Sequence, residues 1–479
     1  MTQAASYPSP ATKARPAERA TSTARPLAAA RRWTLLAGLA MALLTLAAWY
    51  GSLSYYGTHY RGWDAQLYYA HLRSAVIDHD LGIANELTLT PSAAVFDGTH
   101  GPGPWGGLPQ SIDGQPANPY TIGSAVIGLP AFLTAHAWSL ATGSPTDGYA
   151  RPYEIAVTLW YGLLAVLGAT ALVGALARRM DPRAAAIGVV LGFLGTNVLY
   201  YAGFFPLMNH AGSFAALAAL TALALRLHDR PAWRTGWLAA ALLAWLVVLS
   251  RPTDAVLLLV LAPAWLKVPG ALAKTRVALL GAASVGLAVG AQLIAWRLVF
   301  GEWETNAYTR WTGGQGFDFT QSRIVDLLFS GQAGGWFFHP LLGIGFLGLL
   351  GAAALGLRKG KPLRGVLAAF VAAAALHALL YSFWISWDSG ASFGNRIFVN
   401  SAPLMMIGLA WWASRVMQAR RKWLSITLAG AVVLAALLWN ALLLYNDVNR
   451  TLPMKETATT QSVWQAQVGA LQALAGVRP

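Results

Sequence analysis

Apolar runs of roughly 17–25 residues recur along most of this chain, and each is long enough to cross a ~30 Å hydrocarbon core as a helix. They limit the fold strongly, because only helices and closed barrels satisfy their backbone polar groups inside a bilayer. Of the 479 residues, 56% are apolar and 11% are charged, whereas soluble domains carry about 25% charged residues. The sequence therefore predicts a polytopic helical membrane protein and excludes a soluble enzyme, a coiled coil and a disordered chain.

We expect an all-α fold with about 11, and at most about 13, transmembrane helices. Segment 118–141 is also apolar, but counting it as a crossing would invert every later loop. It is therefore predicted to be an interfacial or re-entrant element, anchored by Trp138 and broken by Pro130. The alternative is an ordinary span together with a second crossing elsewhere. The predicted spans are 33–51, 153–177, 184–204, 207–227, 236–250, 254–268, 276–300, 339–357, 363–383, 398–416 and 423–445.

Charge separates the connections between these spans into two sets. One set contains 23 of the 34 Lys and Arg residues and only 3 of the 19 acids. Short loops rich in Lys and Arg stay in the cytoplasm, so the N-terminus is predicted to be cytoplasmic and the C-terminus periplasmic. The net charge of +15 then reflects membrane orientation, and we expect no nucleic-acid partner. The basic set comprises the N-terminal tail and the loops at 178–183, 226–234, 267–276, 358–364 and 415–422.

The predicted organisation has three parts. Residues 1–32 are expected to form a disordered, basic cytoplasmic tail, because they are rich in Ala, Pro, Ser, Thr and Arg and lack apolar periodicity. Residues 33–445 form the transmembrane domain and residues 446–479 a periplasmic tail. Within the domain, a first periplasmic loop at 52–152 carries juxtamembrane helices, and a second large loop follows at 301–338.

Asp64 is the strongest candidate for chemistry. It begins a helical stretch directly after the first span, and Tyr68 and Ala75 share its face. The helix dipole favours a charged carboxylate in a first turn, and such a carboxylate at the water–lipid boundary can take a proton from an acceptor hydroxyl. Tyr68 and Tyr69 suit the same depth and are candidates for donor binding. The alternative is that Asp64 only caps its helix.

Several motifs follow one another on the predicted outer face. From about residue 33 to 445 they resemble the GT-C class of integral-membrane glycosyltransferases, and most closely the bacterial relatives of protein mannosyltransferases and aminoarabinose transferases. The resemblance implies a GT-C-like fold in a bacterial plasma (inner) membrane. It also implies that a monosaccharide passes from a polyprenyl-phosphate carrier to a periplasmic acceptor, with Asp64 as the general base and with inversion. The motifs are WDAQLYYAHLRSAVIDHDL (63–81), NPYTIGSAVIGLPAF (118–132), GTNVLYYAGFFPLMNHAGSF (195–214), LSRPTD (249–254), GGWFFHPLLGIGFLGL (334–349) and WDSGASFGNR (387–396).

Two arginines are the candidate ligands of the donor phosphate. Arg251 lies in SRPTD and Arg396 in SFGNR, and a guanidinium offers a fixed fork of donors that matches phosphate oxygens. The alternative for both is snorkelling, which is common at helix ends. Asn209 and His210, at the outer end of another span, are further donor-binding candidates, although His210 could equally bond to backbone. Asp388 opens the SFGNR turn and either orients Arg396, meets the sugar, or only shapes the turn.

Two departures from the family pattern bear on cofactors. Related enzymes often carry Lys before the Pro that opens the segment equivalent to 118–141, where this chain has Asn118. Several relatives also have paired acids in the first-loop helix, whereas here Asp64 is followed by Ala65. The pattern leaves room for a divalent metal but does not indicate one, and the His residues show no ligand spacing. No cofactor is expected beyond the lipid-linked sugar donor.

Two other functions remain open. One is a transporter or flippase of lipid-linked glycans, and the other is a glycan polymerase or ligase that uses pyrophosphate-linked oligosaccharides. Transporters place charged groups near the midplane, whereas the acids and most histidines here crowd the predicted outer face. That asymmetry favours an enzyme. The expected partners are the lipid-linked donor, membrane lipids and an acceptor that the sequence does not name: a protein, a lipid or an envelope glycan.

Overall fold

The computed structural model describes residues 16–89, 108–311, 316–356, 363–390, 392–453 and 457–476. Within these ranges the regular secondary structure is helical, apart from two isolated β-bridges, which confirms the predicted all-α class. Seven helices are long and apolar enough to cross a membrane, as expected of a polytopic helical membrane protein. Six of these seven coincide with predicted spans, and the seventh is Gly123–Thr142, which was predicted not to cross. Four further predicted spans are shorter apolar helices, and span 398–416 falls in neither group, so the number of eleven crossings stays a prediction.

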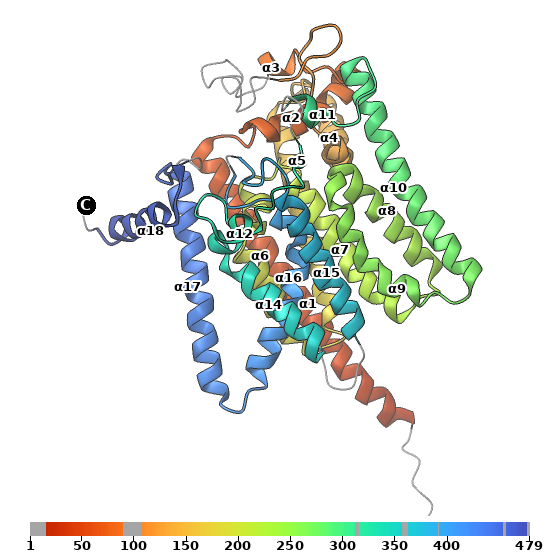
Figure 1. Ribbon diagram of the computed structural model, residues 1–479, viewed down its shortest axis with the longest axis vertical. Helices are drawn as coiled ribbons and strands as arrows, with labels where there is room; N and C mark the ends of the chain where they lie inside the picture. The colour runs from red at the N-terminus through yellow and green to blue at the C-terminus, as the bar shows by residue number, and fades with distance from the viewer. Residues whose placement is uncertain are drawn as a thin grey trace, which may run out of the picture.

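The helices form one bundle, with α16 (Phe398–Met417) near its centre (Figure 1). Every residue from Phe398 to Trp411 is buried, against α6, α7 and α14. Helices approach closely there because small residues line the contacts: a Cβ on Gly408 would lie 1.8 Å from the Gly345 carbonyl oxygen. The remaining central helices are α1 (Pro16–Tyr56), α5 (Arg151–Leu176), α6 (Pro182–Leu194), α7 (His210–Asp229), α14 (Pro340–Leu355) and α15 (Arg364–Ser382).

Two groups of helices flank this centre, and a third group covers one end (Figure 1). One flank is α8 (Arg234–Ser250), the 3-10 helix η4 (Pro252–Leu261), α9 (Ala262–Leu266) and α10 (Ala271–Phe300). The opposite flank is α17 (Lys422–Val448) with α18 (Thr460–Leu474) packed on it. The end group is α2 (Trp63–Arg73), η1 (Ser74–Asp78), α3 (Glu86–Leu89), α4 (Gly123–Thr142) and α11 (Ala307–Trp311). Three short helices complete the bundle: η3 (Tyr200–Phe204), α12 (Ile324–Phe329) and α13 (Gly335–Phe338).

The start of α1 and the α9–α10 and α16–α17 connections lie at the end of the bundle opposite α2, α3 and α11 (Figure 1). Side-chain contacts bring other basic loops to this same end: Arg179 pairs with Asp229, and Lys267 contacts His228. We call it the basic end, and the end that carries α2 the Asp64 end. Among the described residues, these basic connections and the segments around α2 thus lie at opposite ends of the bundle.

The orientation in the membrane is testable with reporter fusions. Because short Lys- and Arg-rich loops stay in the cytoplasm, fusions after residues 181, 230, 271 and 419 should report a cytoplasmic location. Fusions near residues 110, 390 and 460 should report a periplasmic one. A cytoplasmic reading at 390 would contradict the orientation and, with it, an outer-face site.

One sequence prediction was wrong in its local structure, and the structure differs in part from another. Residues 16–32 of the predicted disordered tail are the first part of helix α1; residues 1–15 lie outside the described residues, and the disorder of the tail stays a prediction. Pro130 does not break α4, which is continuous from Gly123 to Thr142. A side chain of the neighbouring helix contacts α4 close to this point, since Trp160 Nε1 donates to the Ile127 carbonyl at 2.8 Å.

Helix α4, which was predicted to lie at the membrane interface, packs against α5. Tyr161 in α5 donates to the Ser124 carbonyl at 2.7 Å, and His136 lies 2.6 Å from the Tyr153 hydroxyl near the start of α5. These contacts involve only the Asp64-end half of α5. By length and composition α4 is also one of the seven helices that could cross, so its interfacial placement stays a prediction.

Two predicted spans are irregular rather than continuous helices. Span 184–204 divides into α6 and the π-helix η3, and span 254–268 begins as the 3-10 helix η4. Where α6 ends, Asn440 Nδ2 donates to the Gly195 carbonyl at 2.9 Å, so a side chain satisfies a carbonyl released by the helix end. Asn197 Nδ2 likewise donates to the Asn395 carbonyl at 2.9 Å, one residue before Arg396.

Candidate active site

A sharp turn before α2 positions Asp64 at the end of the bundle. Gly62 has φ of +77°, a conformation that residues with a side chain rarely adopt. A Cβ on Gly62 would also lie 2.5 Å from the Phe205 ring. The helix then starts at Trp63, and Asp64 falls in its first turn, where the helix dipole favours a carboxylate.

Asp64 is held by two hydrogen-bond donors from distant parts of the chain. Its Oδ2 forms an ion pair with Nη1 of Arg396, and its Oδ1 accepts a 2.7 Å hydrogen bond from the Tyr120 hydroxyl. No side chain makes a capping hydrogen bond at the start of α2, a helix described in full. The side chains of Asp64 and Arg396 keep 20% and 22% of their surface exposed. The pair is thus ordered by tertiary contacts and still accessible to a ligand.

Aromatic rings lie in a row beside this ion pair. The ring centroids of Tyr68 and Tyr120 are 4.6 Å apart, those of Tyr120 and Tyr308 are 5.5 Å apart, and Trp384 follows 6.1 Å from Tyr308. Burial raises the pKa of the Tyr68, Tyr120 and Tyr308 hydroxyls. All three therefore stay protonated near neutral pH and can donate hydrogen bonds.

The charge of Arg396 is secured by its neighbours. Burial alone would lower the pKa of its guanidinium, but Asp64 and the phenol groups of Tyr201, Tyr120 and Tyr68 raise that pKa above its ordinary value. Arg396 lies in the connection between α15 and α16, so the ion pair joins the start of the chain to its last third.

Arg251 lies in the turn between α8 and η4, with a side chain that is 17% exposed. Its Nη2 donates to the Tyr381 hydroxyl at 2.9 Å, and its Nη1 lies 3.3 Å from Nε2 of His210. Its Nε is 3.9 Å from an Asp254 oxygen. The charges of Arg251, Asp64 and Arg396 all influence the pKa of the Tyr68 hydroxyl, so both arginines lie within electrostatic range of this tyrosine.

A buried polar cluster surrounds Asp254 behind Arg251. Asp254 and His377 are fully buried, and His377 Nε2 lies 3.1 Å from Oδ1 of Asp254. The other carboxylate oxygen accepts from Asn400 Nδ2 and, at 3.2 Å, from Ser213 Oγ. These partners come from α15, α16 and α7. The cluster thus fixes the position of the Asp254 side chain one helical turn after Arg251.

Five of the predicted site residues lie in this region of the Asp64 end. They are Asp64, Tyr68, His210, Arg251 and Arg396. They come from α2, the first residue of α7, the α8–η4 turn and the α15–α16 connection.

Three predicted site residues have other contacts. Asn209 Nδ2 donates to the Ser250 carbonyl at 2.6 Å and so fixes the turn just before Arg251. Tyr69 lies on another face of α2, because consecutive helical residues differ by about 100° in direction, and its hydroxyl donates to the Gly148 carbonyl. Asp388 accepts from the Gly390 amide at 3.3 Å and from Gln332 at 3.4 Å. These contacts of Tyr69 and Asp388 are to residues other than Asp64.

The sequence did not single out Tyr120 and Tyr381 as residues of the site, nor Asn118 as the residue that positions Tyr120. Asn118 Nδ2 donates to the Leu67 carbonyl at 2.7 Å, and its Oδ1 accepts from the Tyr120 amide at 3.1 Å. It thereby holds its segment on α2, with the Tyr120 hydroxyl directed at Asp64. The NPY tripeptide was a local signal for Tyr120, whereas nothing around Tyr381 in the sequence points to Arg251.

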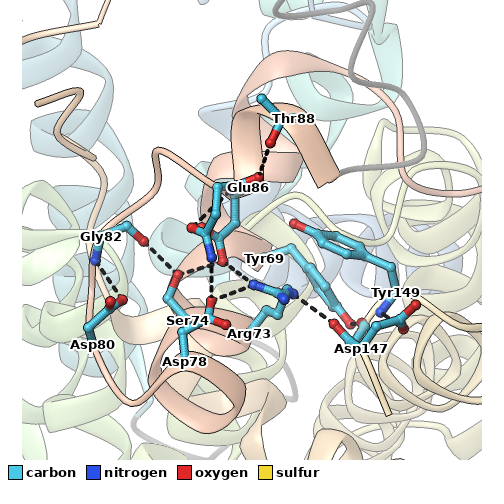
Figure 2. A network of polar contacts seen from close by, with 12 residues as sticks. Tyr69, Arg73, Ser74, Asp78, Asp80, Gly82, Glu86, Thr88, Asp147 and Tyr149 are labelled. Carbon is cyan, nitrogen blue, oxygen red and sulfur yellow. Dashed lines mark hydrogen bonds and ion pairs between the residues drawn. The ribbon is translucent and has the colours of Figure 1, made fainter. Parts of the chain in front are cut away.

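A second polar network braces the far end of α2 (Figure 2). Arg73 pairs with Asp78, bonds Glu86 Oε1 at 2.7 Å and donates to the Asp147 carbonyl at 2.7 Å. Ser74 also donates to Glu86 Oε1 at 2.7 Å. These bonds connect α2, α3 and the loop before α5, and they hold α2 in place from the end opposite Asp64.

Loss of Arg73 should destabilise this network strongly. The side chains of Arg73 and Glu86 are only 5% and 3% exposed, and removing one partner of a buried pair costs about 3–5 kcal/mol. We expect Arg73→Ala to lower the free energy of unfolding by that amount, measured by equilibrium unfolding in detergent micelles. The control Arg310→Ala, whose partners Glu302 and Glu304 are 45% and 17% exposed, should cost less than about 1 kcal/mol. Equal losses in the two variants would contradict the buried-pair interpretation.

Over the described ranges, no group of three or more His, Cys, Asp or Glu side chains lies close enough to hold a metal ion. The expectation that no metal is required stays a prediction.

Comparisons with known proteins did not identify a related protein. No family model, curated protein or solved structure matches the chain. The resemblance to GT-C glycosyltransferases therefore stays a prediction from the sequence motifs.

Proposed function

We propose that this chain is a membrane glycosyltransferase of the GT-C type, which moves a monosaccharide from a polyprenyl-phosphate carrier to an acceptor hydroxyl on the periplasmic face of a bacterial inner membrane. The ion pair between Asp64 and Arg396 carries the proposal, because it joins the candidate base to a candidate phosphate ligand. Arg251, near Tyr68, adds a second guanidinium. A base beside two cations suits displacement of a phosphate-linked sugar.

In the proposed step, the acceptor oxygen attacks the anomeric carbon and the bond from that carbon to the phosphate oxygen breaks. The leaving polyprenyl phosphate keeps the electron pair, and Asp64 takes the hydroxyl proton. A carboxylate offers about four lone-pair sites, and the bonds to Arg396 and Tyr120 each use one. Room remains for the acceptor, and direct attack inverts the anomeric configuration.

The arginines would stabilise the charge that builds on the leaving phosphate. Both side chains are partly exposed, so a phosphate oxygen can reach them from the Asp64 end. An incoming phosphate would compete with Asp64 for the Arg396 guanidinium. That exchange would release the carboxylate toward the acceptor at the moment when the donor is bound.

A transporter of lipid-linked glycans is the second candidate, and one observation favours it. Asp254 and His377 are fully buried among helices, and ionisable groups inside membrane bundles often mark transport pathways. However, Asp254 follows Arg251 by one turn, and His377 lies within about two turns of the end of α15 at Ser382. That position supports an orienting role for the Asp254 cluster more than a midplane carrier site. A pyrophosphate-dependent polymerase or ligase would leave the Asp64 contacts without a use.

The proposal is tested by supplying purified protein with polyprenyl-phosphate hexoses and pentoses and measuring released polyprenyl phosphate. Mass spectrometry of envelope glycans, lipids and proteins from a deletion strain identifies the acceptor. In the deletion strain we expect one envelope component to be lighter by the mass of one sugar. Expression of the wild-type protein should restore that mass, and expression of Asp64→Asn should not. Intact lipid-linked sugar crossing a vesicle bilayer without phosphate release would instead support the transporter.

A further inference from the structure

An apolar cavity of about 350 Å³ lies between α8, η4, α9 and α10. Small residues open it, namely Ala240, Ala244 and Gly281, and the rings of Trp237 and Trp265 line it as well. Its volume falls within the ~300–1,000 Å³ range of ligand sites. Along α8 it extends from Trp237 to Ala244, which is roughly 10 Å at 1.5 Å per residue. This length suits part of a single hydrocarbon chain.

Basic side chains gather where the cavity reaches the basic end of the bundle. Trp265 Nε1 donates to the Lys274 carbonyl at 3.0 Å, and the Lys274 ammonium lies 5.9 Å from the Trp265 ring centre. Lys267 is exposed, with its ammonium 2.7 Å from Nε2 of His228, and exposed Arg276 precedes the lining residue Val277.

The charge at this mouth is positive on balance. The acid nearest in the chain to His228 is Asp229, and its carboxylate is already paired with Arg179. Trp265 marks the depth of lipid headgroups, where tryptophan is enriched in membrane proteins. The apolar cavity, Trp265 and the cations thus follow one another in the same order as the acyl chain, the interfacial region and the phosphate of an anionic lipid.

We propose that this region binds one anionic phospholipid from the leaflet at the basic end. Its acyl chain would occupy the cavity, and its phosphate would contact Lys267, Lys274 and Arg276. Basic pockets between transmembrane helices recognise anionic headgroups in this way. The proposed site is separate from the Asp64 end and does not depend on the glycosyltransferase proposal.

The test uses the full-length protein in nanodiscs containing equal amounts of phosphatidylglycerol and phosphatidylcholine. Native mass spectrometry after release then counts the lipids retained per protein and reports the oligomeric state. Gly281→Leu should block the cavity, because a Cβ on Gly281 meets nothing within 4 Å. Gly286→Leu is the matched control, since that glycine is equally unobstructed in α10 but does not line the cavity.

A second pair of variants tests the headgroup contacts. Each Lys or Arg near the membrane surface contributes about 1 kcal/mol to anionic-lipid binding, so Lys274→Gln with Arg276→Gln should weaken phosphatidylglycerol binding roughly thirtyfold. Arg420→Gln with Arg421→Gln removes the same charge at another basic connection and should change retention little.

Three outcomes would overturn the proposal. The first is equal retention of the two phospholipids by the wild type, and the second is unchanged retention in Gly281→Leu. The third is a different occupant, seen either as selective retention of added polyprenyl phosphate or as a dimer that Gly281→Leu abolishes.

Discussion

Asp64→Asn protein is expected to transfer sugar about 10²–10⁴ times more slowly than the wild type, because removing a positioned general base typically costs that much in rate. Asparagine keeps the size of the side chain and an acceptor for the Tyr120 hydroxyl, but it cannot take the acceptor's proton. The measurement is release of polyprenyl phosphate per folded protein, with donor binding followed in parallel. Donor binding should persist, because the arginines remain.

A matched control separates this effect from a simple helix-terminus effect. Asp326 also lies in the first turn of a helix, α12, and is exposed, so Asp326→Asn should keep wild-type turnover. Near-normal turnover in Asp64→Asn would show that Asp64 only holds Arg396 in place. The carboxylate of Asp254 would then be the next to test.

Lysine at Arg251 or Arg396 is expected to impair the enzyme, although it keeps the positive charge. Lysine lacks the planar fork that binds two phosphate oxygens at once. Alanine should be worse, with donor binding and transfer each falling about tenfold to a hundredfold, since a charge-assisted hydrogen bond is worth about 1.5–3 kcal/mol. Donor affinity is measured on purified, quantified protein. If the arginines merely snorkel, both lysine variants should keep full affinity.

The contact between Asp64 and Arg396 calls for a double-mutant test. If Arg396 acts only by holding Asp64, Arg396→Ala should add nothing in protein that already carries Asp64→Asn. If it binds the donor phosphate, the second change should weaken donor binding there as well. Arg151→Lys is the control, since Arg151 lies at the start of α5, is 51% exposed and pairs with Glu154. Full donor affinity in Arg396→Ala would remove this residue from the site.

Much of the fold could be predicted because a bilayer leaves a chain few choices. Each predicted span contains helix in the structure, although 184–204 and 254–268 are not single α-helices. In span 184–204 a side chain from another helix satisfies the backbone, as Asn440 does at Gly195, and a local pattern carries no information about such a partner. A local pattern also does not show that the fold tolerates Pro130 inside the continuous helix α4.

The candidate site could be predicted only in part. The motifs singled out Asp64, Arg251 and Arg396, and the structure places all three at one end of the bundle; their roles stay a prediction. Periodicity also distinguishes Tyr68, on the face of Asp64, from Tyr69. The partners of Arg251 and Asp254 could not be predicted. Tyr381, which accepts a hydrogen bond from Arg251, is an ordinary aromatic residue of a span. His377 lies in an apolar helix, and only the tertiary structure brings it to Asp254.

The sequence by itself determined that the chain is a polytopic helical membrane protein, and it divided the connections into two sets by charge. Both follow from the preferences of individual residues for lipid, water or the basic side of a membrane, which act locally. Only the tertiary structure decided that Asp64 pairs with Arg396, that Asn118 directs Tyr120 to it, and that Arg251 lies beside His210. These pairings depend on how helices distant in the chain pack together. Contacts between small residues, such as that of Gly408 with Gly345, determine how closely the helices approach one another.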